Sequence, residues 1–343
     1  MLVWRKVDTR NMRFCVIPAY RASTTILQVV ASALCFVDRV VVVDDECPEG
    51  SGTLAQTAYL GDSRVTVLFN ERNMGVGGAM KAGITFALDH AAQIIVKIDA
   101  DAQMDTAFIP EMLSVLDADR KIGLVKGNRF ASGQVARVMP LWRLIGNSAL
   151  TLLVRLATGY WGSVDPTNGY LMIRASALRR VNLSKLSDRY YFEISLLAAL
   201  GMRRIEIAEL GMPAIYGEAR SSSLSIERVA LTFPFLLAKS LAKRLFWQYV
   251  ISDMNVGSLF LLSGFGLTTF SFLFGSMIWS QALRSGIPTT AGTATIVVAP
   301  MIIGFQLLLN ALLFDVQFAP KVAKIDEEDF VTPSAVMRSL TRR

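Results

Sequence analysis

The sequence predicts an α/β domain with a mostly parallel sheet, followed by an amphipathic region and two membrane-spanning helices. Short β-branched runs alternate with segments of helical apolar spacing in the first part of the chain, a pattern typical of a parallel sheet covered by helices on both faces. Charged residues are absent from 254–283 and again from 285–314. Each run exceeds the ~20 apolar residues that cross a bilayer core. Two buried helices of a soluble domain are the alternative.

The strands and helices of the α/β domain follow one another from residue 14. Strands are indicated by short apolar, β-branched runs, and helices by apolar residues three and four positions apart. We expect strands over 14–17, 39–43, 65–68, 94–98 and 122–125, and helices over 23–36, from about 53, over 79–90 and after Arg143.

Polar residues follow three successive strands, in the order Asp44-Asp45, Asn73 and Asp99. Ligands of open α/β sheets bind at the carboxyl ends of the strands. A single aspartate at such a place can equally cap a helix. Three in succession favour a binding site at this edge of the sheet.

The strand at 94–98 leads into two carboxylates, Asp99 and Asp101. Where a strand gives way to a loop, this spacing lets both carboxylates reach one divalent cation, with Gln103 as a further oxygen ligand. Such ligands suit Mg²⁺ or Mn²⁺. A solvated acidic turn is the alternative for an isolated D-x-D pattern.

A glycine-rich loop at 73–78 precedes the helix at 79–90. It is not the dinucleotide-binding fingerprint, because Met80 stands where the third glycine would fall, and it lacks the lysine pattern of a P-loop. Its bare backbone can approach a ribose or a diphosphate. A plain flexible connection is the alternative.

Charge and cysteine content indicate how the chain is arranged at a membrane. Arg284 is the only charged residue between the two apolar runs, and the positive-inside rule therefore assigns both termini to the cytoplasm. We expect no secretory signal at the start of the sequence, because residues 1–13 are charged and lack an apolar run. Three cysteines at no metal-ligand spacing indicate reduced thiols.

The net charge of +7 suits an anionic membrane surface, and the basic amphipathic stretch at 226–251 is typical of an interfacial helix. Nucleic acid is a poorer explanation, because no basic-aromatic module is present. Glycines in the apolar runs permit helix packing and a homo-oligomer.

Six short stretches carry a resemblance to a known family. They are 16–20, 43–45, 73–79 with Gly83, 99–103, 127–130 and 165–170. In this order they resemble the glycosyltransferase family 2 enzymes of GT-A (Rossmann-like) fold, in the branch of dolichyl-phosphate mannose synthases and polyprenyl-phosphate glycosyltransferases. The resemblance covers about residues 14–225. It implies a membrane-bound, inverting, metal-dependent enzyme that moves a sugar from a UDP- or GDP-sugar to undecaprenyl or dolichyl phosphate.

The resemblance also implies roles for individual residues. The nucleotide set is Pro18, Ala19, Tyr20, Asp44, Asp45, Asn73, Gly75, Lys81 and Ala100. The catalytic set is Asp99, Asp101, Arg129 and Asp165, and the ligands of Mg²⁺ or Mn²⁺ are Asp99, Asp101 and Gln103. The residues for lipid phosphate or diphosphate are Arg129, Arg143, Arg220 and Ser222. Solvated surface arginines are the alternative for Arg129 and Arg143, and a helix cap for Glu193, a position often acidic in the family.

One departure from the family pattern concerns the nucleotide base. The family usually has a glycine and a serine after the Asp-Asp pair, where this chain has Glu46 and Cys47, so the identity of the base stays open. We expect Cys47 to be a small packing residue, since no neighbour in the sequence would lower the pKa of its thiol.

The expected domains are a cytoplasmic catalytic domain over 1–225, amphipathic helices over 226–253, a hairpin over 254–318 and a cytoplasmic tail over 319–343. The two spans are placed at about 257–281 and 294–315, in the cell (inner) membrane.

Two other functions remain open on the sequence. A synthase of the same fold with a glycan acceptor normally has a Q-x-x-R-W motif and more membrane spans, which this chain lacks. A catalytically silent scaffold or flippase partner would not need the intact set Asp99, Asp101 and Gln103.

Overall fold

The computed structural model describes residues 12–131, 141–213 and 226–325. The chain forms two compact units. The first contains residues 1–240 and 320–343, and the second contains residues 241–319. The chain therefore leaves the first unit once and returns to it near its carboxyl end.

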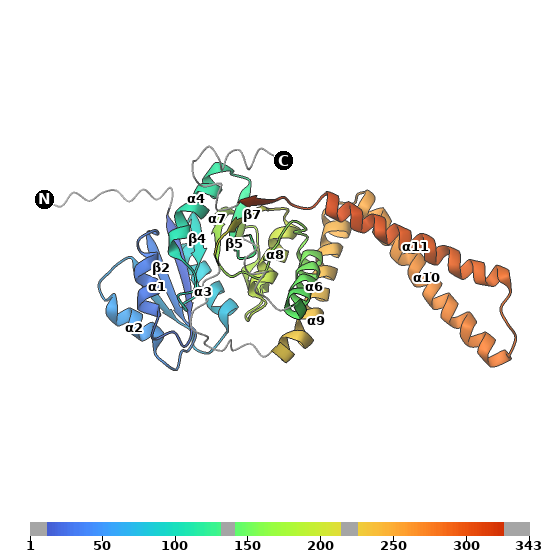
Figure 1. The fold of residues 1–343 in the computed structure, drawn as a ribbon, viewed down its shortest axis with the longest axis horizontal. Coiled ribbons are helices and arrows are strands. Elements are labelled where there is room, and N and C mark those ends of the chain that lie inside the picture. Colours follow the sequence, from blue (N-terminus) through green and yellow to red (C-terminus); the bar gives the residue numbers. More distant parts are fainter. Residues whose placement is uncertain (1–11, 132–140, 214–225, 326–343) are drawn as a thin grey trace. The chain divides into compact units, whose positions relative to one another are not determined.

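The first unit is built on an eight-stranded sheet in the order β3-β2-β1-β4-β6-β5-β7-β8, of which Figure 1 labels β2, β4, β5 and β7. The strands are β1 (Arg13–Ala19), β2 (Arg39–Asp44), β3 (Val65–Phe69), β4 (Ile94–Lys97), β5 (Ile122–Asn128), β6 (Leu171–Arg174), β7 (Glu206–Gly211) and β8 (Val322–Ile325). Only β6 runs antiparallel to its neighbours in this sheet. The predicted α/β class and the mostly parallel sheet are confirmed.

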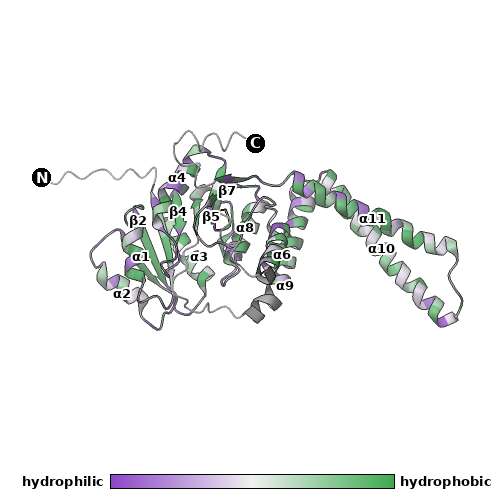
Figure 2. Ribbon diagram, in the orientation of Figure 1, coloured by the Kyte–Doolittle hydropathy of each residue, from purple (hydrophilic) through white to green (hydrophobic). Residues whose placement is uncertain are grey.

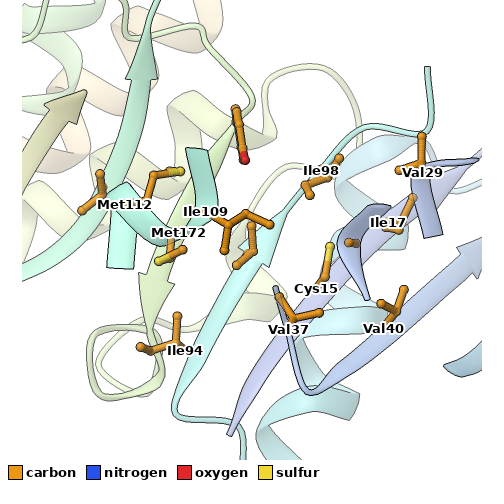
Figure 3. Packing of buried hydrophobic residues seen from close by; sticks show 14 of the residues in the cluster. Cys15, Ile17, Val29, Val37, Val40, Ile94, Ile98, Ile109, Met112 and Met172 are labelled. Atoms are coloured by element: carbon orange, nitrogen blue, oxygen red, sulfur yellow. The ribbon is translucent and has the colours of Figure 1, made fainter. Parts of the chain in front are cut away.

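Helices cover both faces of the sheet. One face packs against α1 (Ile26–Ala33), α2 (Ser51–Ala58) and α4 (Ile109–Ala118), and the other against α3 (Val76–Asp89), α7 (Ala175–Leu178) and α8 (Phe192–Met202). Alternate residues of a strand point to opposite faces. Cys15 and Ile17 accordingly meet Val29 and Ile109 on the first face (Figure 3), while Phe14 and Val16 pack on the second.

A smaller third cluster joins α6 (Leu141–Thr158), α8 and α9 (Ile226–Phe246). Val154, Tyr191 and Leu237 are buried in it, and the Tyr191 hydroxyl hydrogen-bonds Ser240 Oγ at 2.9 Å. Short 3₁₀ turns, η2 (Thr106–Phe108) and η3 (Leu183–Lys185), complete the first unit. The helix expected over 226–251 ends as an α-helix at Phe246 and continues as a π-helical turn, η4 (Trp247–Ser252).

The second unit contains α10 (Val256–Ser285) and α11 (Ala291–Gln317). Both are long and apolar enough to span a membrane, and Figure 2 shows green along most of both helices. Only 22% and 11% of the most apolar stretches of α10 and α11 are buried, whereas the core helix of a soluble protein is mostly buried. The exposure favours a lipid environment.

Small residues bring α10 and α11 together. A Cβ added to Gly264 would lie 2.9 Å from the Gly304 carbonyl oxygen, so neither glycine can be enlarged without moving a helix. At the base of the pair, buried Arg244 binds Asp315 through two hydrogen bonds of 2.7 and 2.9 Å. The Tyr249 hydroxyl donates to the same carboxylate at 2.9 Å.

Candidate active site

The turn after β4 presents two carboxylates at the carboxyl edge of the sheet. Ala102 adopts a left-handed conformation with φ of 60°, and the Gln103 N–H donates to Asp101 Oδ1 at 3.0 Å. Asp99 and Asp101 line two clefts, of about 490 and about 250 Å³. The carboxylate pair therefore lies where the two clefts adjoin.

The larger cleft gathers most of the residues expected at the nucleotide. It is lined by Pro18, Ala19, Tyr20, Asp45, Asn73, Gly75 and Ala100, which come from three strand ends and the glycine loop. Arg21, Arg189 and Tyr190 line it too. The sequence did not indicate these three residues, and no pattern around Arg189 and Tyr190 distinguishes them from an ordinary loop.

Asp44 and Asp45 bind backbone amides with both carboxylate oxygens. Asp45 accepts from the Met74 and Gly75 N–H groups at 2.8 and 2.7 Å, which fixes the start of the glycine loop. Asp44 is buried and accepts from the Cys47 and Gly52 N–H groups at 2.7 and 2.6 Å. Asp44 thus acts on the start of α2 as a cap does. It lines neither of these two clefts, but it lines a third, of about 660 Å³, together with Tyr20 and Asn73.

The pKa of the Cys47 thiol differs from the expectation. Burial raises it, but hydrogen bonds, first of all that with the Ser51 side chain, bring the pKa below its ordinary value. The Cys47 sulfur lies 3.1 Å from Ser51 Oγ. The expectation that nothing lowers this pKa was wrong, because Ser51 approaches through the turn into α2.

The glycine loop is shaped by close packing against residues 187–192. A Cβ on Gly77 would lie 2.2 Å from the Ser187 carbonyl oxygen, and the Gly78 N–H donates to the Asp188 carbonyl at 2.8 Å. Lys81 pairs with Asp188 and donates to the Leu186 carbonyl at 3.3 Å. Lys81, expected at the nucleotide, therefore lines neither cleft.

The smaller cleft joins the carboxylate pair to Gln103, Arg129 and the 167–170 loop. Asp165 binds Arg129 with its two oxygens, at 2.8 Å to Nε and 3.0 Å to Nη2. Burial works against the charge of Asp165, but the Arg129 guanidinium holds the pKa of this carboxyl below its ordinary value. Asp165 is 1% exposed and does not line either cleft. It therefore holds the Arg129 side chain at the smaller cleft and does not itself face the cleft.

Two lysines are buried in the strands on either side of β6. Lys97, at the end of β4, contacts Asp99 and Glu193. Burial alone lowers the pKa of Lys97, yet these two carboxylates raise it above the ordinary value. Lys126, on β5, donates to the Asp165 carbonyl, and burial lowers its pKa. A lone charge in the β-branched run of β4 was the sequence signal for Lys97, which we missed.

The donor set at the junction fits a divalent cation that brings further ligands from a substrate. Burial, and then the nearby charge of Asp99, raise the pKa of Asp101, as expected where carboxylates are crowded. No group of three or more His, Cys, Asp or Glu side chains forms a metal site in the described part of the chain. Mg²⁺ is commonly held by one or two carboxylates plus substrate phosphates, which matches Asp99 and Asp101.

The remaining residues of the expected acceptor site cannot be placed in the same way. Arg143 belongs to α6, with its side chain outside the described set. Arg220 and Ser222 lie outside the described residues.

The sequence is similar to those of several known proteins. Residues 14–181 match the family model described as Glycosyl transferase family 2. The chain is 32% identical to an undecaprenyl-phosphate mannosyltransferase of Micrococcus luteus, over 53% of this chain and 75% of that one. It is 31% identical to a polyprenol monophosphomannose synthase of Mycolicibacterium smegmatis, over 46% and 59% of the two chains.

A UDP-N-acetylglucosamine–dolichyl-phosphate N-acetylglucosaminyltransferase of Methanococcus voltae is 26% identical, over 62% of this chain and 90% of that one. Among solved structures, S. aureus TarS 1–349 is similar over 88% of this chain and 91% of that one, at 13% identity and a TM-score of 0.41. The identity to the mannosyltransferase, and the share of it that is covered, show the family. The chain belongs to glycosyltransferase family 2.

Proposed function

We propose that this glycosyltransferase moves a sugar from a nucleotide-diphosphate sugar to a polyprenyl phosphate. The observation that supports this most is that Asp99 and Asp101 line two clefts at once. A donor and an acceptor can then meet at one pair of carboxylates. The named relatives act on undecaprenyl, polyprenol and dolichyl phosphates, which favours a lipid phosphate as the acceptor.

We assign the nucleotide to the larger cleft. Tyr20 is 45% exposed there and can stack on a base, while the loop held by Asp45 lines the same space. In this position the donor diphosphate would reach Asp99 and Asp101. Mg²⁺ or Mn²⁺, held by these two residues with Gln103, would supply positive charge to the leaving diphosphate.

The acceptor phosphate would enter the smaller cleft beside Arg129. A phosphate oxygen attacks the anomeric carbon as the bond from that carbon to the diphosphate breaks, which inverts the configuration. The electron pair leaves with the nucleoside diphosphate. Because a phosphate monoester is already anionic at neutral pH, no strong general base is needed, and positioning with charge stabilisation carries the reaction.

Arg129 would bind the acceptor phosphate, and Asp165 would hold its guanidinium in place. The Arg129 side chain is 44% exposed while Asp165 is 1% exposed, so the arginine and not the aspartate is accessible to a ligand. Arginine suits planar recognition of phosphate. Under this proposal Asp165 is a positioning residue.

We propose that α10 and α11 anchor the enzyme in the cell membrane with both termini in the cytoplasm. The chain enters this pair from the first unit and returns to it, where β8 pairs with β7. Two crossings bring a chain back to the side from which it started. A polyprenyl phosphate in the same leaflet would then be within the enzyme's reach.

The test is an assay of the purified full chain with Mn²⁺, polyprenyl phosphate and a panel of UDP- and GDP-sugars, with released nucleoside diphosphate as the readout. We expect release from one donor, dependent on the lipid. Release without lipid would indicate another acceptor. No release, together with no nucleotide binding by calorimetry, would favour the silent scaffold and refute the proposal.

A further inference from the structure

A buried ammonium group lies directly against one of the two carboxylates of the site. Lys97 is 1% exposed. Its Nζ donates to Asp99 Oδ1 at 2.6 Å and to the Gly169 carbonyl at 3.2 Å, and lies 3.2 Å from Glu193 Oε1. An ammonium group has three N–H donors, and three oxygen acceptors surround this one.

Three separate segments build this cluster. Lys97 comes from β4, Gly169 from the loop before β6, and Glu193 from the first turn of α8. A Cβ on Gly169 would lie 2.7 Å from Lys97 Nζ and 3.2 Å from Asp99 Oδ2, so only a glycine leaves room for the contact. The ammonium group is held in place by packing as well as by charge.

We propose that Lys97 keeps the affinity of the donor-free site for a divalent cation low, so that the cation binds together with the donor diphosphate. This inference rests on the proposed function. Lys97 donates to one carboxylate oxygen of Asp99 and offsets the charge of that carboxylate. One carboxylate oxygen of Asp101 accepts a hydrogen bond from the Gln103 backbone N–H. A cation arriving alone would find few available oxygens and a repelling ammonium group.

The donor changes this balance. Its diphosphate brings negative charge and several oxygen ligands, which are the ligands Mg²⁺ and Mn²⁺ prefer. The Lys97 ammonium group then attracts the negatively charged diphosphate that binds with the cation, since opposite charges a few ångströms apart interact strongly in a partly buried site. Lys97 therefore favours the complete donor–cation assembly over the cation alone.

Wild-type protein gives the first test, by electron paramagnetic resonance of Mn²⁺ added to the purified full chain. We expect weak Mn²⁺ binding that tightens at least tenfold when UDP or GDP is present. Equally tight binding without nucleotide would overturn the inference. Failure of both nucleotides to bind would instead count against the proposed function, so the two failures can be told apart.

Variants isolate the ammonium group. Lys97→Met should tighten Mn²⁺ binding in the absence of nucleotide by about tenfold and lower kcat, because Asp99 is no longer held. If Lys97 only stabilised the structure, its loss would lower both the Mn²⁺ affinity and kcat. Lys126→Met is the matched control. It removes a second ammonium group buried among the described residues, which bonds the Asp165 carbonyl, and should leave Mn²⁺ affinity within about twofold.

Removal of Lys97 alone leaves the Glu193 carboxylate, which is 14% exposed, without the ammonium group that pairs with it. This unpaired buried charge can unfold the protein. The double variant Lys97→Met with Glu193→Gln avoids this and is compared with Glu193→Gln alone. The double variant should bind Mn²⁺ more tightly than the single variant. Equal or weaker binding would overturn the inference.

Discussion

At the scale of the residue, aspartates at one edge of the sheet are distinguished by their partners. Asp44 and Asp45 bind backbone amides with both oxygens, Asp165 binds Arg129, and Asp99 and Asp101 are the aspartates that line both clefts. The positions of most of these residues at strand ends could be predicted from sequence alone. Their partners could not, because Asp165 and Arg129 are 36 residues apart and meet only when the sheet has formed.

Asp101→Asn tests the carboxylate pair. It should lower the rate of nucleoside diphosphate release by at least a hundredfold, because a neutral amide oxygen is a weaker ligand for a divalent cation than a carboxylate and does not offset its charge. Thermal unfolding should change little, since Asp101 makes no ion pair among the described residues. The matched control is Asp62→Asn, which removes a surface carboxylate paired with Arg64 and should retain activity. Near-normal turnover in Asp101→Asn would rule out the assigned metal role.

Asp165→Asn tests the ion pair with Arg129 through its pH dependence. The pKa of Asp165 is lowered in the folded protein, so the ion pair stabilises the fold above the unfolded pKa of about 3.9. This contribution is lost as pH falls through the lower folded pKa. We expect the variant to be less stable by roughly 1–3 kcal/mol at pH 7, below the range for fully buried pairs, because Arg129 is partly exposed.

The measurement is the unfolding temperature of both proteins between pH 3 and 7. The difference between wild type and variant should be constant at neutral pH and narrow below about pH 4. A difference that does not depend on pH would show that charge does not contribute.

At the scale of the element, the glycine loop and the segment at 187–192 behave as one packed unit. The sequence indicated that the glycine loop precedes a helix. The segment that packs against this loop could not be predicted, because residues 187–192 follow β6, a short strand that the sequence did not indicate. Strands β1 to β5 were predicted from their β-branched runs. The strands β7 and β8 were missed, since Glu206, Glu209 and Lys324 interrupt their apolar pattern.

Gly77→Ala tests this packing. The added Cβ would lie 2.2 Å from a backbone oxygen and 2.8 Å from Phe192 Cβ, so the substitution should destabilise the protein by about 2–3 kcal/mol through overpacking. Denaturant unfolding measures the loss. Gly146→Ala is the control, because a Cβ there meets nothing within 4 Å and alanine favours a helix. Equal stability of the two variants would contradict the packing described here.

At the scale of the whole molecule, the chain returns to its sheet after two long apolar helices. Hydropathy alone predicted the two helices, and their ends at 256–285 and 291–317 lie within a few residues of the expected ones. The return of the chain to the sheet could not be predicted. Strand β8 has only four residues, and only its pairing with β7 identifies it as a strand.

The return predicts a topology that thiol labelling can measure. Cys35 is exposed in the first unit, and Thr289 lies between α10 and α11. In intact cells an impermeant maleimide should label Thr289→Cys and leave Cys35 unlabelled until the membrane is permeabilised. Labelling of Cys35 in intact cells would contradict a cytoplasmic first unit.

Mass spectrometry of the lipid product tests the central claim most directly. The purified chain is incubated with Mn²⁺, polyprenyl phosphate and the donor that releases its nucleotide. We predict a new lipid with the mass of the acceptor plus one glycosyl residue, formed by the wild type and reduced at least a hundredfold in Asp101→Asn. Unchanged lipid beside a consumed donor, or equal product from the variant, would contradict transfer to a lipid phosphate at the Asp99–Asp101 pair.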